Sequence, residues 1–100
     1  MSMDYLVTLG VPPSLEDNVV DCLLTLESER GFSSLQINAH HHLNQGLSIA
    51  EQVTGRQKEI RFEIRVSEEG LQELLQQLRQ EFSGSQLYYW VSPVLQSGVI

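Results

Sequence analysis

Two segments with strand-like alternation bracket a polar loop near the middle of the chain, and this feature constrains the fold more than any other. After the loop, apolar residues alternate with charged ones; the apolar set is Ile60, Phe62, Ile64 and Val66, and the charged set is Glu59, Arg61, Glu63 and Arg65. Before the loop, one face would carry Leu35, Ile37 and Ala39, and the other Gln36, Asn38 and His40. A period of two is typical of a β-strand. We therefore expect function at the loop, residues 41–57, because loops on a rigid scaffold can vary without unfolding it.

Two further segments have the spacing of amphipathic helices. The first runs to about Ser28, with Ser14 and Asp17 resembling a capping box at its start; its apolar stripe is Leu15, Val19, Cys22, Leu23 and Leu26. The second begins after Ser67, a residue type that caps helices, and Gly84 lies where a helix commonly stops. Its stripe is Leu71, Leu74, Leu75, Leu78 and Phe82.

Residues 4–10 and 86–92 complete the pattern as a first and a last strand, the latter stopped by Pro93. The order is then strand, helix, strand, strand, helix, strand. That order predicts an α+β, ferredoxin-like βαββαβ sandwich, in which both helices cover one face of a four-stranded antiparallel sheet. Its 100 residues predict a single domain, 1–100, with an ordinary core.

The composition excludes several classes of protein. The net charge is −7, from six Lys and Arg against thirteen Asp and Glu, which opposes binding to nucleic acid. No apolar stretch approaches the roughly 20 residues that cross a bilayer, and the first residues lack the basic region of a signal peptide. Cys22 is the only cysteine, so an internal disulfide is impossible and a cytoplasmic location is expected.

Alternation also sorts the strand residues into two faces. The face expected to meet the helices carries Tyr5, Val7, Leu9, Leu35, Ile37, Ile60, Phe62, Ile64, Leu87, Tyr89 and Val91. The opposite face would carry Leu6, Thr8, Arg61, Glu63, Arg65, Tyr88 and Trp90. An exposed set of this kind usually marks an interface, so we expect Leu6, Arg61, Glu63, Tyr88 and Trp90 to mediate self-association. The alternative is that residues 95–100 partly cover Trp90 within the same chain.

The run of three histidines is the feature with metal-ligand chemistry. On an extended backbone, His40 and His42 point to the same side and could chelate a divalent ion such as Zn²⁺ or Cu²⁺. Glu51 is the nearest further ligand, and other subunits of an oligomer could supply the rest. The alternative is three uncommitted histidines in a solvated loop.

The same loop also offers an anion site. Ser48 and Glu51 have the spacing of a capping box, and Gly55 would close a short helical turn whose free backbone donors suit an anion. Arg56 could bind a phosphate or carboxylate, or it could instead pair with Glu51 or Glu59.

Enzyme chemistry finds little support in the sequence. Cys22 lies on an apolar stripe and is interpreted as an inert core thiol. Ser48 has histidines close in sequence but no assignable acid or oxyanion site, and no Gly-rich phosphate loop of the P-loop or dinucleotide type appears. We expect no catalytic residues.

Nearly the whole chain resembles the PII-like superfamily, the relatives of the nitrogen regulatory protein PII. Residues 58–66 resemble the strand that follows the T-loop of PII proteins, and the end of the last strand, residues 91–94, is similar to the PII carboxy-terminal signature. More narrowly, residues 31–34 and 47–56 resemble a compact, uncharacterised PII-like family, often encoded beside heavy-metal efflux transporters. The resemblance places the 41–57 loop at the T-loop position. It also implies a homotrimer and signalling by a loop that docks on a partner, often a membrane transporter.

The chain departs from nucleotide-binding PII proteins at the turn before the last strand. Those proteins carry Gly-Asp-Gly-Lys there, whereas residues 83–86 read Ser-Gly-Ser-Gln and contain no lysine. ATP or ADP binding of the PII kind is therefore not expected. The loop also lacks a tyrosine, so regulation by tyrosine modification does not carry over.

Three functional hypotheses follow. The first is a cytoplasmic PII-like regulator that binds a small ligand or metal at clefts between subunits and docks on a partner through the 41–57 loop. The second is a divalent-metal-binding protein of heavy-metal resistance. The third is an oligomerisation module that binds no ligand.

Overall fold

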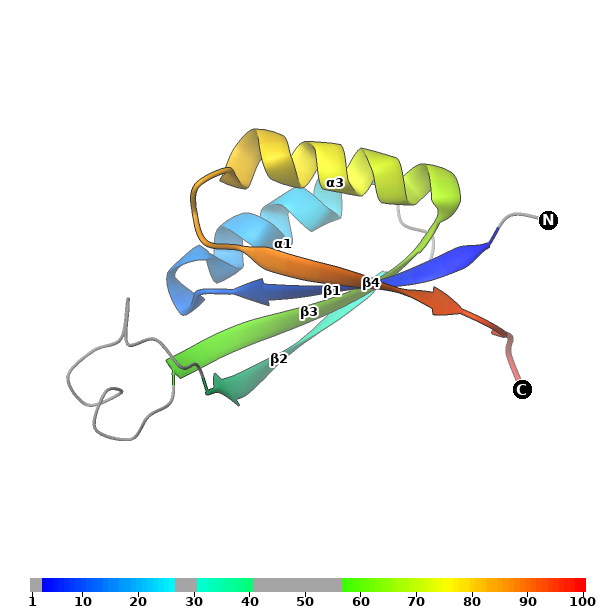
Figure 1. Cartoon of the computed structure of the whole chain (residues 1–100), viewed down its shortest axis with the longest axis horizontal. Helices are drawn as coiled ribbons and strands as arrows, with labels where there is room; N and C mark the ends of the chain where they lie inside the picture. The colour runs from blue at the N-terminus through cyan, green and yellow to red at the C-terminus, as the bar shows by residue number, and fades with distance from the viewer. Residues whose placement is uncertain (1–2, 27–30, 41–56) are drawn as a thin grey trace.

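A computed structural model of the chain describes residues 3–26, 31–40 and 57–100. It has four strands, two α-helices and one 3₁₀ turn among those residues (Figure 1). In chain order they are β1 (Asp4–Val11), η1 (Pro13–Leu15), α1 (Glu16–Thr25), β2 (Phe32–Ala39), β3 (Gln57–Ser67), α3 (Glu68–Phe82) and β4 (Tyr88–Val94). This order confirms the predicted ferredoxin-like α+β fold.

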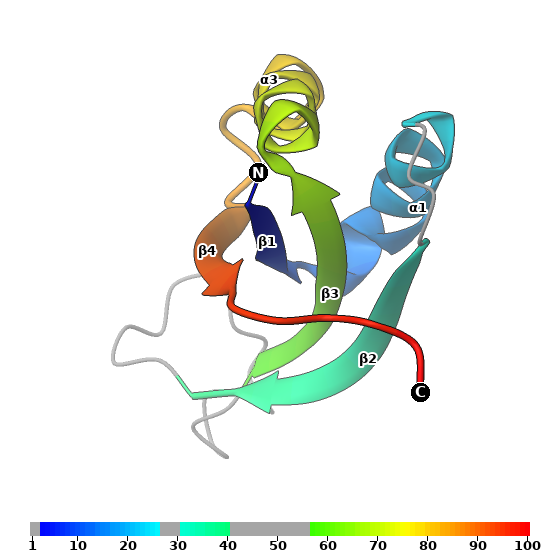
Figure 2. The same cartoon turned by 90° about the vertical axis from the view of Figure 1, so that its right-hand side faces the viewer.

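The four strands form one antiparallel sheet in the order β2-β3-β1-β4. The two longest pairings, β1 with β3 and β3 with β2, make β1 and β3 the central strands and leave β2 and β4 at the edges. Both helices lie on one face of this twisted sheet, and the other face carries no helix of the described residues (Figures 1 and 2). The sheet thus has a helix-covered face and what we call the open face.

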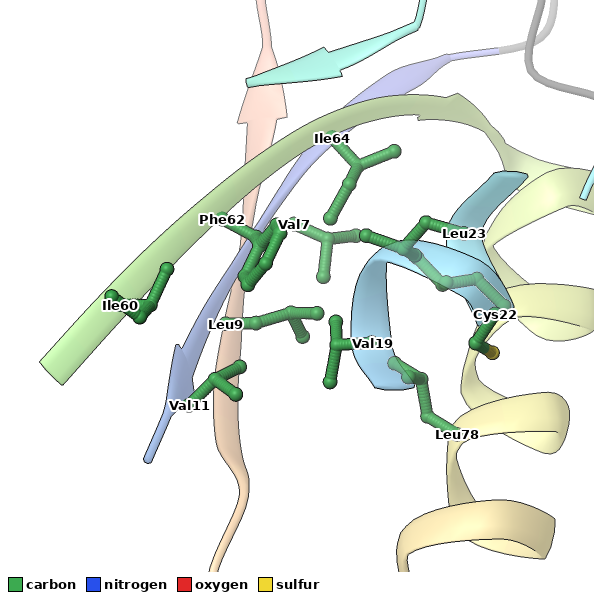
Figure 3. Packing of buried hydrophobic residues seen from close by; sticks show 11 residues of the cluster. Val7, Leu9, Val11, Val19, Cys22, Leu23, Ile60, Phe62, Ile64 and Leu78 are labelled. Carbon is green, nitrogen blue, oxygen red and sulfur yellow. The ribbon is translucent and has the colours of Figure 1, made fainter. Parts of the chain in front are cut away.

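The core lies between the helices and the covered face. Phe62 is completely buried on β3, and it faces Leu9 of β1 in the strand register. Val19 of α1 and Leu74 of α3 close the core from the helix side. Figure 3 shows apolar side chains of β1 and β3 directed toward those of the helices. The apolar stripes of both helices therefore face the sheet, as predicted.

The two helices begin differently. Ser67 caps α3, and its hydroxyl oxygen accepts a hydrogen bond from the Gly70 backbone N–H at 3.1 Å, as the sequence predicts. The predicted capping box at Ser14 was wrong, because Pro12 and Pro13 start a 3₁₀ turn that places Ser14 inside the first turn and not before it. Neither η1 nor α1 has a side-chain cap.

Strand β4 does not stop at Pro93, contrary to expectation. It runs through Pro93 to Val94, and Pro93 lies opposite Tyr5 of β1. Proline is tolerated because β4 is an edge strand, where a missing N–H need not break a ladder on both sides.

The face assigned to two apolar residues of β2 was also wrong. Leu35 lies opposite Arg61 and Ile37 lies opposite Glu59, so both belong to the open face. Phe32 of β2 packs against the core, with its ring centroid 6.1 Å from that of Phe62. Alternation defines the two faces of a strand, but the register with β3 decides which face meets the helices.

No helix within the described parts of the chain combines the length and the apolar character needed to span a membrane.

Candidate functional site

The open face brings together the residues predicted for an interface. Thr8 of β1 lies opposite Glu63 of β3 on one side and Trp90 of β4 on the other. Two residues further along β1, Gly10 lies between Arg61 of β3 and Tyr88 of β4 in the same way. In the other direction, Leu6 lies between Arg65 and Ser92. The set spans three strands, and the edge strand β2 adds Leu35 and Ile37.

Tyr88 crosses the sheet because the residue beside it on β1 is a glycine. A Cβ at Gly10 would stand 2.2 Å from two ring carbons of Tyr88, so the ring occupies the space that a side chain would need. The Tyr88 hydroxyl thereby reaches β3 and donates a hydrogen bond to Glu59 Oε2 at 2.6 Å. Glu59 is buried, with 7% of its surface exposed, and this short bond satisfies its carboxylate.

The environment of Tyr88 keeps its phenol protonated. Burial raises the pKa of Tyr88 above its ordinary value of 10.0, and the adjacent Glu59 carboxylate raises that pKa further. Arg61 acts in the opposite direction, through a hydrogen bond and its positive charge. The net shift is upward, so Tyr88 acts as a donor across the physiological range.

Trp90 and Arg61 extend this arrangement toward solvent. The Tyr88 and Trp90 rings stack with centroids 5.9 Å apart, and the Arg61 guanidinium carbon lies 5.2 Å from the Trp90 ring centroid. That distance suits a cation–π contact. We call Glu59, Arg61, Tyr88 and Trp90 the aromatic cluster.

The aromatic cluster is incompletely satisfied within one chain. Arg61 Nε is buried and has no hydrogen-bond partner among the described residues. Trp90 nevertheless keeps 43% of its surface exposed. The exposed indole and the cation offer a partner both apolar area and charge.

Residues 95–100 do not provide the cover for Trp90 that the alternative interpretation required. The side chains of Leu95, Val99 and Ile100 are themselves almost fully exposed. Their side chains therefore bury almost nothing of their own chain.

Glu59 and Gly10 are the members of this site that sequence reasoning did not select. A glycine inside a strand signals close approach by another group, and Gly10 carries that signal. Glu59 shares the alternation of Arg61 and Glu63, so its face was deducible. Its contact with Tyr88 was not, because the two residues are 29 positions apart.

Most of the predicted loop site lies outside the described residues. This applies to Ser48, Glu51, Gly55, Arg56 and His42. His40 is described, and it is exposed directly after β2. Within residues 3–26, 31–40 and 57–100, no three His, Cys, Asp or Glu side chains are grouped so as to hold a metal ion. The metal and anion sites stay predictions.

A groove of about 150 Å³ lies where α3, the following turn and β4 meet. Its apolar lining comes from Leu75, Leu78, Phe82 and Leu87, with Leu9 of β1. Arg79 of α3 also lines it, and donates a hydrogen bond to the Tyr89 hydroxyl at 3.3 Å. The turn is tight, with positive φ at Gly84 and Gln86.

Cys22 lies on the covered side, away from the aromatic cluster. It is buried, and burial together with the Glu81 carboxylate raises the pKa of its thiol to about 12. A thiol with that pKa is not a nucleophile at neutral pH.

The fold recurs in several solved structures. A DUF3240 family protein from Shewanella baltica OS155 matches with a TM-score of 0.80 and 26% identity, covering 100% of this chain and 99% of that one. The PII-like protein CPII from Thiomonas intermedia K12, bound to ADP, AMP and bicarbonate, matches with a TM-score of 0.69 and 15% identity over 100% and 98% of the two chains. The periplasmic divalent cation tolerance protein CutA from Archaeoglobus fulgidus matches with a TM-score of 0.70 and 10% identity over 95% and 87%. No curated protein matches the sequence.

These likenesses confirm the predicted resemblance to a compact PII-like family at the level of the fold. The sequence model of one family, described as proteins of unknown function, matches residues 1–100. The chain therefore belongs to the DUF3240 family.

Proposed function

We propose that this protein is a PII-like regulatory protein of the cytoplasm, without catalytic activity. Copies assemble through the open face into a homotrimer that binds a small ligand or metal in the clefts between them. The 41–57 loop then docks on a protein partner, such as a membrane transporter. Binding shifts the loop to the extent that the ligand prefers one loop state over another.

The aromatic cluster is the observation that carries this proposal. A monomer would leave Trp90 exposed beside the buried, unpaired Nε of Arg61, and both features favour a partner on this face. Aromatic and Arg side chains are the types most enriched at the energetic centres of interfaces. The likeness to PII-like folds supports three copies as the assembly.

The regulatory role is favoured over an enzymatic one by the chemistry of the described residues. The chain's one cysteine is buried with a raised pKa, and the Tyr88–Glu59 pair is closed by a short hydrogen bond. Neither group presents an activated nucleophile. A regulator needs a rigid scaffold and a variable loop, and the sheet with the 41–57 connection fits that need.

Native mass spectrometry with and without equimolar Zn²⁺ or Cu²⁺ tests the proposal. A trimer that takes up metal in stoichiometric steps supports a metal-responsive regulator. A trimer that ignores metal directs the search to small anionic ligands and the protein partner. A monomer at micromolar concentration contradicts the proposal.

The substitution Trp90→Asp tests the open face directly. It replaces an exposed apolar ring with a carboxylate on the face that also carries Glu63 and Glu59. We therefore expect the trimer to dissociate, at a cost of about 2 kcal/mol or more and hence about 30-fold or more in the dissociation midpoint. Leu24→Asp on α1 is the matched control, because Leu24 is 68% exposed on the helix side. An unchanged mass for Trp90→Asp would defeat the interface assignment.

A divalent-metal-binding role in metal resistance is the second candidate. It is favoured by the histidine run after β2 and by the fold shared with a protein named for divalent cation tolerance. Replacing His40 and His42 by alanine separates the two functions. If the variant loses metal binding but still docks on its partner, the result supports the regulator. If the variant loses metal binding and the wild type docks on no partner, the result supports metal buffering.

A further inference from the structure

The groove between α3 and β4 is a cavity that the proposed function does not use. α3 lies over the β4 side of the sheet, and β4 is an edge strand, so the groove lies at the rim of the helix layer (Figure 2). Its volume is about 150 Å³, and its apolar lining includes Leu75, Leu78 and Phe82. A cavity of roughly this size in a protein core holds a benzene molecule. The groove therefore has room for one ring or a short aliphatic chain.

One cation stands beside this apolar lining. Arg79 of α3 lines the groove and donates a hydrogen bond to the Tyr89 hydroxyl at 3.3 Å. A guanidinium carries five N–H donors, and no carboxylate of residues 3–26, 31–40 or 57–100 forms an ion pair with this one. Arg79 can therefore direct further donors to a ligand in place of water.

The acidic residue nearest to Arg79 along α3 is directed elsewhere. Glu81 follows two positions later, and residues two apart do not share a face of a helix. The Glu81 carboxylate accepts hydrogen bonds from the Cys22 thiol of α1 and from Gln77, and these bonds lower the pKa of Glu81. Glu81 is therefore engaged at the contact between the helices and does not neutralise Arg79.

The end of α3 beside the groove is capped. The carbonyl end of a helix disfavours anions, so the partners of these carbonyls matter. The Ser83 hydroxyl donates a hydrogen bond to the backbone oxygen of Arg79. The hydroxyl and the backbone N–H of Ser85 both donate to the backbone oxygen of Phe82, the N–H at 3.1 Å. These bonds hold the turn at residues 83–86 against the helix, so the groove is formed within one chain.

We propose that this groove binds a small monocarboxylic acid that carries one apolar ring or short chain. The apolar group would lie against Leu75, Leu78 and Phe82. The carboxylate would accept two N–H donors of Arg79 in the bidentate geometry that suits a planar anion. A phosphate ester fits less well, because it carries nearly two charges and Arg79 is the single charged residue among the described residues that line the groove.

This inference goes beyond the proposed function, whose ligand lies in clefts between copies. Each residue of the groove comes from the same chain, through α3, the turn, β4 and Leu9 of β1. A single copy therefore contains the whole site. Binding in the groove is expected whether or not the copies assemble.

Titration of the ¹⁵N-labelled full-length protein with benzoate at pH 7 and constant ionic strength tests the inference. Benzoate carries one ring and is ionised at this pH. We expect saturable shifts of the amide signals of Leu75, Phe82 and Leu87, with a dissociation constant on the order of 1 mM for a ligand of this size. Benzamide has nearly the same shape without the charge, and it should bind about three- to tenfold more weakly.

Two variants isolate the contribution of the cation. Arg79→Gln should weaken the binding of benzoate by about the same three- to tenfold and leave that of benzamide unchanged. Arg65→Gln is the matched control, because it removes the same charge from the open face, opposite Leu6. It should change neither affinity. Trp90→Asp, which we expect to be monomeric, should bind benzoate as the wild type does.

The outcomes separate this inference from the proposed function. Equal affinities for benzoate and benzamide, or an unchanged benzoate affinity in Arg79→Gln, overturn it, because the groove would then not select a carboxylate. Shifts that do not saturate, or that map to the open face, overturn it as well. Loss of binding in Trp90→Asp contradicts a site within one chain. A monomeric wild type that still binds benzoate supports this inference and overturns the proposed assembly.

Discussion

The two faces of this sheet are built from alternate residues of the same strands, yet they differ in almost every property. The covered face is closed at its centre: Phe62, Val7 and Val11 have no exposed surface and belong to the apolar core. The open face mixes a buried carboxylate, an unpaired guanidinium nitrogen and an exposed indole. The difference indicates that the covered face stabilises the chain, whereas the open face is shaped for a partner.

The largest effect should come from Phe62→Ala on the covered face. It removes a fully buried ring from the centre of the core, so we expect a loss of about 3–5 kcal/mol in the free energy of unfolding. Leu35→Ala on the open face is the counterpart and should cost less than about 1 kcal/mol. Both substitutions are made in a Trp90→Asp protein, which we expect to be monomeric, and urea denaturation then measures the free energy of unfolding of each monomer. Equal losses would remove the distinction between the faces.

Gly10→Ala should have the next largest effect, since it introduces a methyl group where the Tyr88 ring lies. The ring must leave its place over β1, and we expect a cost of about 1–3 kcal/mol. A double-mutant cycle with Tyr88→Ser gives the control, because the clash then has no partner and the penalty of Gly10→Ala should largely disappear. Additive effects of the two substitutions would contradict the close approach.

Tyr88→Phe sharpens the comparison by removing one hydroxyl from the open face. It leaves the buried Glu59 carboxylate without its donor, for an expected loss of about 1–3 kcal/mol at pH 7. The pKa of Tyr88 is raised in the folded state, so its contribution is complete below about pH 10, the ordinary value, and is lost as pH rises through the higher folded pKa. Unfolding free energies across this range should therefore fall more for the wild type than for the variant.

Cys22 gives the smallest of these expected effects and tests the covered side. Its thiol has a pKa of about 12 in place of 9.0, so it binds its proton more tightly in the folded chain. Its contribution is complete below pH 9 and is lost as the pH rises toward 12. The difference in stability between wild type and Cys22→Ala should shrink over that interval in denaturation measured at several pH values. A constant difference would mean that the thiol is not shielded in solution.

Local signals predicted the elements well. Ser67 and Gly84 bound α3 as expected, because capping and left-handed glycine are properties of a few neighbouring residues. The failures at Ser14, Pro93 and Leu35 each depended on context: a preceding proline pair, an edge position and a cross-strand register. For the candidate site, alternation placed Arg61, Tyr88 and Trp90 on one face, but it did not identify the contact between Tyr88 and Glu59.

The sequence by itself determined the order of the elements, the apolar stripes of both helices and the family to which the chain belongs, because periodicity and motifs are written along the chain. The tertiary structure decided which face of β2 meets the helices and which residues surround Tyr88. Pairing of β1 with β3 and β4 brings Glu59 and Tyr88 together across Gly10. Contacts of that kind depend on register and on the space that a missing side chain leaves, and neither is a local property of the sequence.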